Sequence, residues 1–221
     1  MPFIAGDDAK QVQEILTQLP RQVKVVYFTQ ELECQFCRET HQLMEELKEL
    51  SQGKLELEIY NFVNDKEQVD QYKIDKIPAI AVTANGKDYG IRYYGIPSGY
   101  EFSSIMEDIQ EVASGTPSLS DETMKQIQKI TQPLHLQVFV TPTCPYCPSS
   151  VLMAHKLAMA NDNITADMVE ATEFPHLSVK YNVRGVPQTM IGEEHAIEGA
   201  LPEPNFVERV LDAYQKIYPD N

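Results

Sequence analysis

The stretch LQVFVTPTCPYCPSSVLMAHKLAMA, residues 136–160, decides how this chain folds. It opens with Leu136–Thr141, a β-branched and aromatic run that is too short for a helix and predicts a buried strand. Two cysteines follow in Cys144-Pro145-Tyr146-Cys147, and after them a helical pattern continues through Val151, Leu152, His155 and Met159. The cysteine pair therefore lies where a strand turns into a helix.

The same arrangement occurs once before, in VKVVYFTQELECQFCRETHQLMEELKEL, residues 23–50. Val23–Thr29 predicts a strand, Cys34-Gln35-Phe36-Cys37 follows it, and Leu43, Met44, Leu47 and Leu50 have helical spacing. The two first cysteines lie 144 − 34 = 110 positions apart, almost half of the 221 residues. This spacing indicates an internal duplication.

Flanking segments extend the repeat in the same order. Each half has a predicted helix before its first strand, an apolar-Pro pair after its C-x-x-C, a hairpin and a final helix. The proline offset is 187 − 78 = 109, close to that of the cysteines. Asn85-Gly86 predicts a type I′ turn in the first hairpin, and Gly192 marks the second. The predicted helices are Asp8–Leu19, Ser98–Ser114, Ser120–Ile130 and Glu203–Ile217.

The boundary between the halves is expected in the Gly-, Pro- and Ser-rich segment 114–120. We predict a domain over residues 1–115 with Cys34 and Cys37, and a second over 116–221 with Cys144 and Cys147. The segment is too short for a flexible tether, so the two units are expected to dock edge to edge. The fold class is therefore α/β, with two similar units in tandem.

Composition excludes several kinds of protein. Hydrophobic residues make up 43% and charged residues 23%, as in ordinary globular proteins. The net charge of −15 argues against nucleic acid and anionic membranes as partners. No apolar run approaches the roughly 20 residues of a membrane helix, and the first residues do not resemble a secretory signal, so a cytoplasmic location is expected.

A C-x-x-C pair at the start of a helix suits thiol–disulfide exchange. Two intervening residues let the sulfurs bond, and the free N–H groups and dipole of the helix favour a thiolate on the first cysteine. Such motifs lower the thiol pKa from about 8.5 into a range of roughly 3.5 to 7.5. We therefore predict Cys34 and Cys144 as nucleophiles, and Cys37 and Cys147 as the resolving thiols.

The two sites are not expected to be equal. Glu31 and Glu33 flank Cys34 with only Arg38 opposing them, whereas residues 141–148 around Cys144 carry no charge. Because nearby carboxylates disfavour a thiolate, we predict the lower thiol pKa at Cys144. A stabilised thiolate favours the reduced form, so the second site is predicted to be the more oxidising.

Each half contains a strand, a C-x-x-C pair and a helix, followed about 40 residues after the pair by Ile77-Pro78 or Val186-Pro187. This order resembles the thioredoxin fold, and it occurs twice. Over essentially its whole length the chain resembles the tandem-domain protein disulfide oxidoreductases of thermophilic archaea and bacteria, also called glutaredoxin-like. The resemblance implies two thioredoxin-like folds, each a mixed central sheet flanked by helices. It also implies an enzyme that reduces, forms or isomerises disulfides in protein substrates.

Further implications concern the prolines and the electron source. The resemblance implies that Pro78 and Pro187 are cis, and that Ile77, Pro78, Val186 and Pro187 bind an extended substrate peptide. It also implies a partner, an NADPH-dependent thioredoxin reductase, as the source of electrons. The sequence contains no Gly-rich dinucleotide or phosphate loop, so we expect no bound cofactor besides the redox-active disulfides. No metal site is expected either.

Two other classes of function remain open from the sequence. Two C-x-x-C pairs also occur in zinc sites with four cysteine ligands, although these usually place the pairs about 15 to 20 residues apart. A peptide-binding scaffold with structural disulfides is the second alternative. The five histidines are scattered without a partner pattern, and His155 is expected to be a neighbour of the core.

Overall fold

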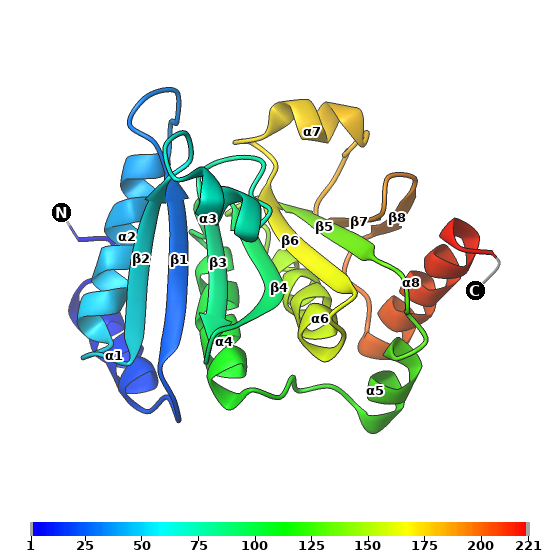
Figure 1. Cartoon of the computed structure of the whole chain (residues 1–221), viewed down its shortest axis with the longest axis horizontal. Coiled ribbons are helices and arrows are strands. Elements are labelled where there is room, and N and C mark those ends of the chain that lie inside the picture. Colours follow the sequence, from blue (N-terminus) through cyan, green and yellow to red (C-terminus); the bar gives the residue numbers. More distant parts are fainter. Residues whose placement is uncertain (1, 220–221) are drawn as a thin grey trace.

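The computed structural model describes residues 2–219, which form a single eight-stranded mixed sheet flanked by helices (Figure 1). The strand order is β2-β1-β3-β4-β6-β5-β7-β8. The first half of the chain contains α1 (Gly6–Thr17), β1 (Val23–Thr29), α2 (Cys37–Leu50), β2 (Leu55–Asn61), α3 (Lys66–Gln71), β3 (Ala79–Ala84), β4 (Lys87–Tyr94) and α4 (Glu101–Ser114). The second half contains α5 (Asp121–Ile127), β5 (Leu134–Val140), α6 (Cys147–Ala160), β6 (Ile164–Glu170), α7 (Pro175–Lys180), β7 (Gln188–Ile191), β8 (His195–Glu198) and α8 (Glu203–Ile217).

Both halves have the same topology. In the first, β1 pairs in parallel with β2 and antiparallel with β3, and β3 pairs antiparallel with β4. In the second, β5 pairs in parallel with β6 and antiparallel with β7, and β7 pairs antiparallel with β8. The duplication visible in the sequence is therefore a duplication of the fold, and each half has the expected mixed sheet.

The halves join through their sheet edges. Strand β4 pairs in parallel with β6, with registers that run from Ile91 opposite Ala166 to Tyr94 opposite Val169. This confirms edge-to-edge docking and makes the two four-stranded units one continuous sheet. The connection between α4 and α5 runs along one end of the molecule, visible at the bottom of Figure 1. The division at residues 115 and 116 stays a prediction.

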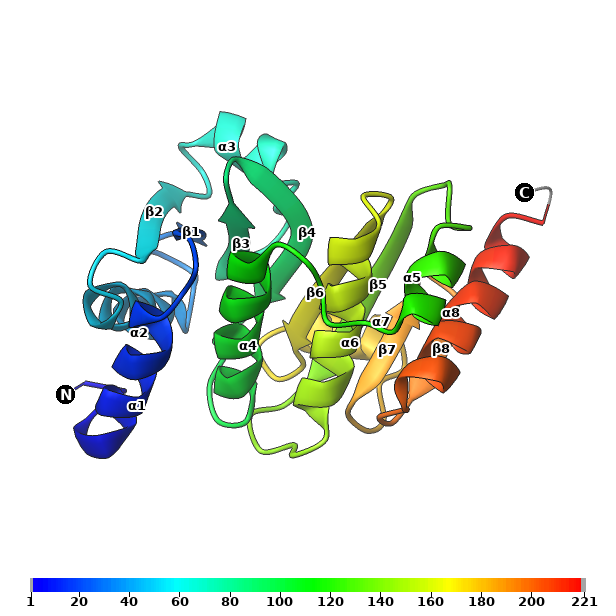
Figure 2. The same ribbon diagram turned by 90° about the horizontal axis from the view of Figure 1, so that it is seen from below.

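Apolar residues cover both faces of this sheet across the junction. Strand side chains alternate between faces, so Tyr27 points into one core cluster and its neighbour Phe28 into the other. The larger cluster includes residues of α1, α2, α4, α6 and α8, while the smaller one lies under α3 and α7. Figure 2 shows α3 on the opposite side of the sheet from α1, α2 and α4.

Local signals in the sequence explain several element ends. Asn85 and Gly86 have φ of 53° and 74°, the positive values that a type I′ turn requires. The Ser120 side chain caps α5 by accepting a hydrogen bond of 3.2 Å from the Thr123 amide. The short helices α3 and α7 escape prediction, because six residues each are too few to show a helical period. None of the helices within residues 2–219 combines the length and apolar character of a membrane span.

Candidate redox site

The second C-x-x-C pair is held by two consecutive turns between β5 and α6. The Cys144 amide donates to the Thr141 carbonyl at 3.1 Å, and the Cys147 amide donates to the Cys144 carbonyl at 3.4 Å. These turns bring the two Cα atoms to 5.5 Å, and the sulfurs form a disulfide. Pro148 lies in the first turn of α6, where the missing N–H removes no helical hydrogen bond.

Each disulfide belongs to a half that carries a cis-proline. The Ile77-Pro78 and Val186-Pro187 bonds are both cis, as the resemblance implies. In the second half the Cys144 Sγ lies 3.6 Å from the Val186 carbonyl oxygen, so the proline loop faces the sulfur directly. A strand end supports each loop, because Gly95 and Gly199 donate their amides to the carbonyls of Pro78 and Pro187 at 3.0 and 2.8 Å.

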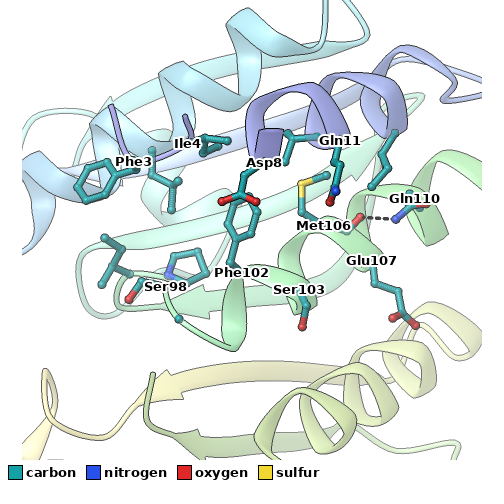
Figure 3. Close-up of a pocket in the computed structure, with 16 residues that line it drawn as sticks. Phe3, Ile4, Asp8, Gln11, Ser98, Phe102, Ser103, Met106, Glu107 and Gln110 are labelled. Carbon is teal, nitrogen blue, oxygen red and sulfur yellow. Dashed lines mark hydrogen bonds between the residues drawn. The ribbon is translucent and has the colours of Figure 1, made fainter. Parts of the chain in front are cut away.

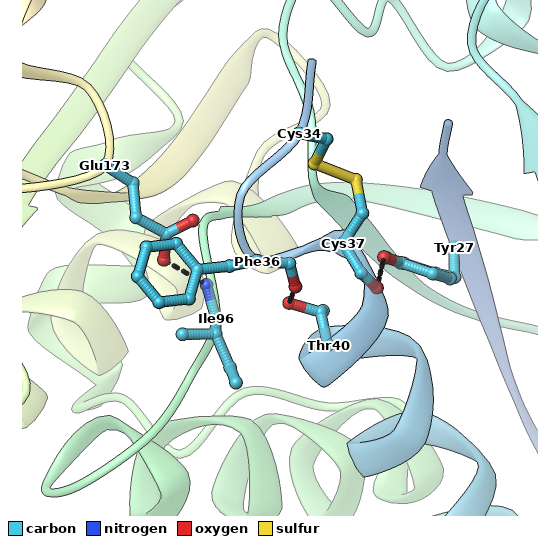
Figure 4. Close-up of a disulfide and its surroundings, with 7 residues drawn as sticks. All are labelled: Tyr27, Cys34, Phe36, Cys37, Thr40, Ile96 and Glu173. Atoms are coloured by element: carbon cyan, nitrogen blue, oxygen red, sulfur yellow. Dashed lines mark hydrogen bonds between the residues drawn. A yellow bond between two sulfur atoms is a disulfide. The ribbon is translucent and has the colours of Figure 1, made fainter. Parts of the chain in front are cut away.

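The first pair, Cys34 and Cys37, also forms a disulfide with a Cα separation of 5.5 Å (Figure 4). The hydroxyl of Tyr27 on β1 donates to the Cys37 carbonyl at 2.6 Å. Burial raises the pKa of that hydroxyl, so it remains a donor. The Thr40 hydroxyl donates to the Phe36 carbonyl at 2.7 Å and stabilises the first turn of α2.

The first cysteines differ from the sequence-based expectation in two respects. They lie three residues before their helices, because α2 and α6 begin at Cys37 and Cys147. In the second pair, the hydrogen-bonded turns over residues 141–147 precede the first residue of the helix. Exposure also differs: Cys34 is half-buried, whereas Cys144 is only 7% exposed. In both pairs the second cysteine is nonetheless the more buried one, at 3% for Cys37 and 0% for Cys147.

A buried carboxyl group, for which the sequence gives no signal, lies beside the second site. Glu101 is the first residue of α4 and is 1% exposed. Its neighbour Tyr100 donates its amide to the Pro142 carbonyl at 2.9 Å, which ties this helix end to the turn before Cys144. The Ser104 hydroxyl donates to Glu101 at 2.6 Å, while burial raises the pKa of the carboxyl to about 7. In the sequence Glu101 looks like an ordinary acidic residue of a helix start.

A second buried polar cluster joins the two halves between α4 and α6. The Nδ1 of His155 lies 2.5 Å from Oδ2 of Asp108, and the hydroxyl of Tyr93 donates to the same oxygen. Both His155 and Asp108 are 0% exposed. His155 is therefore in the core, as expected, but it also carries a hydrogen bond across the interface of the halves.

An apolar groove of about 620 Å³ lies between α1 and α4 (Figure 3). Its apolar lining includes Phe3, Ile15, Phe102 and Met106, and Ile96 is another of the lining residues. Ile96 also lies near Phe36 of the first C-x-x-C motif (Figure 4). The groove thus shares Ile96 with the surroundings of the first disulfide.

The four cysteines occupy two disulfides rather than one cluster. Within residues 2–219 no group of three or more His, Cys, Asp or Glu side chains is arranged to hold a metal ion. A zinc site of the four-cysteine kind considered above needs all four sulfurs as thiolates in one cluster.

The sheet order, the cis-prolines and the paired cysteines define a class: the chain is a tandem thioredoxin-fold protein with two C-x-x-C disulfides, the arrangement of thiol–disulfide oxidoreductases. The thioredoxin domain family matches residues 134–212. A protein disulfide oxidoreductase from Aeropyrum pernix is similar over 98% of this chain and 96% of its own, with a TM-score of 0.90 and 27% identity. These similarities confirm the fold class and the resemblance.

A second group of similar proteins has a different name. The alkylhydroperoxide reductase AhpF of Enterococcus faecalis has a TM-score of 0.84 and 27% identity, over 94% of this chain and 99% of the other. The F subunit of alkyl hydroperoxide reductase in Staphylococcus epidermidis is 30% identical over 150 residues, which are 67% of this chain and 28% of that protein. A protein named NADH dehydrogenase from Bacillus subtilis is 26% identical over 139 residues, or 63% and 27% of the two chains. The chain thus spans little more than a quarter of the length of these curated relatives.

Proposed function

We propose that this protein is a protein disulfide oxidoreductase, which reduces, forms or isomerises disulfides in client proteins. The observation that carries the proposal is the 3.6 Å approach of the Cys144 sulfur to the carbonyl of Val186 beside Pro187. If an extended strand of a client pairs with the backbone of Val186, the disulfide of that client lies next to Cys144. By the duplication of the fold, Ile77 and Pro78 have the same role for Cys34.

Reduction of a client proceeds in two exchanges at either site. The thiolate of Cys144 attacks one client sulfur, which forms a mixed disulfide and releases the other client sulfur as a thiolate. The thiolate of Cys147 then attacks the sulfur of Cys144 and releases the first client sulfur. The client has gained two electrons and, with protons from solvent, two thiols, while Cys144 and Cys147 end as a disulfide. Oxidation of a client is the same sequence reversed, and the surrounding redox poise sets the direction.

Protein clients are supported by apolar side chains around the sulfurs. Tyr146 lies between the two cysteines of the second site and is 70% exposed, and Leu32, two residues before Cys34, is 78% exposed. These exposed side chains are adjacent in sequence to the cysteines and are available for contact with a client chain. From the resemblance to the tandem-domain disulfide oxidoreductases, we also propose a cytoplasmic location and an NADPH-dependent thioredoxin reductase as the electron donor.

The test is a matched pair of substitutions at one site. In a Cys34→Ser/Cys37→Ser background, Cys147→Ser should accumulate a covalent complex with a scrambled, disulfide-bonded client that dithiothreitol releases, whereas Cys144→Ser should form none. Insulin reduction should be lost in both. If Cys147→Ser traps no client and the unsubstituted protein reduces insulin no faster than free dithiothreitol, a peptide-binding scaffold is the better description.

A second candidate function follows from the similarity to the alkyl hydroperoxide reductase proteins. In that case the two disulfides carry electrons from a reductase to a hydroperoxide-reducing partner instead of to general clients. The assays separate the two: an electron carrier of this kind supports peroxide turnover by such a partner protein but refolds scrambled ribonuclease no faster than buffer.

A further inference from the structure

One carboxyl group of the second half lies at the first redox site. Glu173 belongs to the loop between β6 and α7, and its Oε1 accepts a hydrogen bond of 2.7 Å from the amide of Ile96, 77 residues away. Figure 4 shows this carboxyl group beside Phe36, within the motif that holds Cys34 and Cys37. The side chain is half-buried and crosses the junction between the halves.

The backbone that Glu173 contacts is the one that supports the first proline loop. Gly95 donates its amide to the Pro78 carbonyl at 3.0 Å and precedes Ile96. A Cβ atom at Gly95 would lie 2.8 Å from Oε1 of Glu173, so the carboxyl group is in close contact with this segment. Glu173 is therefore hydrogen-bonded to Ile96 and lies against Gly95, in the segment that supports the proline loop of the first site.

Other acidic groups surround the same carboxyl group. Glu39 faces it from α2, two residues after Cys37, and Glu170 faces it from the end of β6. Tyr27, whose hydroxyl binds the Cys37 carbonyl, faces both Glu173 and Glu39 from β1. Burial, together with Glu170 and Glu39, raises the pKa of Glu173 to about 7. A further negative charge at this place, such as a thiolate, therefore competes with the ionisation of Glu173.

We propose that Glu173 is a positioning residue of the first site, which sets the proton affinity of the Cys34 and Cys37 thiols from the neighbouring half. When Glu173 is ionised, it disfavours the thiolate of the reduced site; when it holds the proton, it permits that thiolate. The first site is thus incomplete without the second half of the chain. The inference rests on the proposed dithiol role of Cys34 and Cys37, but it concerns their acidity and not their clients.

The test measures thiolate formation directly. In a Cys144→Ser/Cys147→Ser background only the first site titrates, and ultraviolet thiolate absorbance is followed against pH after reduction. Glu173→Gln should lower the first thiol pKa by about one unit, the lower end of what one nearby charge does. Glu194→Gln, an exposed glutamate of the second half, is the matched control and should leave the curve unchanged. Identical curves for the two variants overturn the proposal.

A second measurement needs no substitution at Glu173. Coupling between two titrating groups is reciprocal, so reduction of Cys34 and Cys37 must raise the pKa of the Glu173 carboxyl as the thiolate forms. Carboxyl ¹³C chemical shifts in the same background, oxidised and reduced, report this change; equal values in the two states overturn the proposal even if Glu173→Gln fails to fold. If Glu173→Gln shifts the thiol pKa as expected but the unsubstituted protein does not reduce insulin, the result counts against the proposed function and not against the role of Glu173.

Discussion

Replacement of Glu101 by Gln should change how the stability of this protein depends on pH. The carboxyl group is 1% exposed, and burial raises its pKa from an ordinary 4.5 to about 7. Because the pKa is higher in the folded state than in the unfolded state, the folded protein binds more protons between these values. The free energy of unfolding therefore falls as the pH rises through this window, and the full loss is present above pH 7.

The size of the effect follows from the two pKa values. At about 1.4 kcal/mol for each factor of ten in acidity, a rise from 4.5 to about 7 corresponds to roughly 3 kcal/mol. Gln has the shape of the protonated acid and does not titrate, so the variant should lose about 3 kcal/mol less stability than the parent between pH 4.5 and pH 8. Glu173 titrates in a similar range but is present in both proteins and cancels in the difference.

The assay is guanidinium unfolding of the oxidised parent and Glu101→Gln at a series of pH values, with Glu122→Gln, an exposed glutamate, as the control. The control should follow the parent at every pH. A difference between Glu101→Gln and the parent that stays constant from about pH 4.5 to about pH 8 would refute the reasoning, because it would mean that Glu101 ionises in the folded state as it does in the unfolded chain.

Three further predictions concern the other parts of the site. Gly99→Ala should destabilise the protein by about 2 kcal/mol or more in urea unfolding, because a Cβ there overlaps the Pro142 carbonyl oxygen and φ is +61°. The control Gly86→Ala has φ of +74° but open space around the Cβ and should lose only about 1 kcal/mol, so equal losses would contradict this explanation. Asp108→Ala should lower the free energy of unfolding by about 3 kcal/mol or more, since Tyr93 and His155 lose their buried acceptor. Glu107→Gln breaks only a half-exposed ion pair with Lys156 and should cost under about 1 kcal/mol, so a similar loss for both would show that the buried cluster contributes no stability. Thiolate absorbance of the two proteins that keep only one C-x-x-C pair should give the lower thiol pKa at Cys144 over the pH range below about 7, where Glu101 is protonated. The reverse order would remove the argument for a more oxidising second site.

Much of the fold can be predicted from the sequence because its determinants are local. Val23–Thr29 is predicted as a strand and is β1 without a change of bounds, and Glu203–Ile217 is likewise α8. The turn at Asn85 and Gly86 follows from residue types that tolerate positive φ. The two C-x-x-C pairs and their trailing prolines lie at fixed spacings, so a comparison of the halves finds them without knowledge of any contact. Their assigned roles in catalysis and substrate binding stay predictions.

The sequence by itself thus determined the duplication, the order of the strands and longer helices in each half, and the spacing of the paired cysteines, since these depend on residue type and position over short distances. Only the tertiary structure decided that β4 pairs with β6, that Glu101 is buried at the helix end tied to the turn before Cys144, and that half-buried Glu173 binds the Ile96 amide of the other half. The physical reason is that a carboxyl group acquires a high pKa from what covers it, and the groups that cover Glu173 come from strands and helices far away in the chain. No local pattern in the sequence indicates that the edge strand β4 pairs with the edge strand β6.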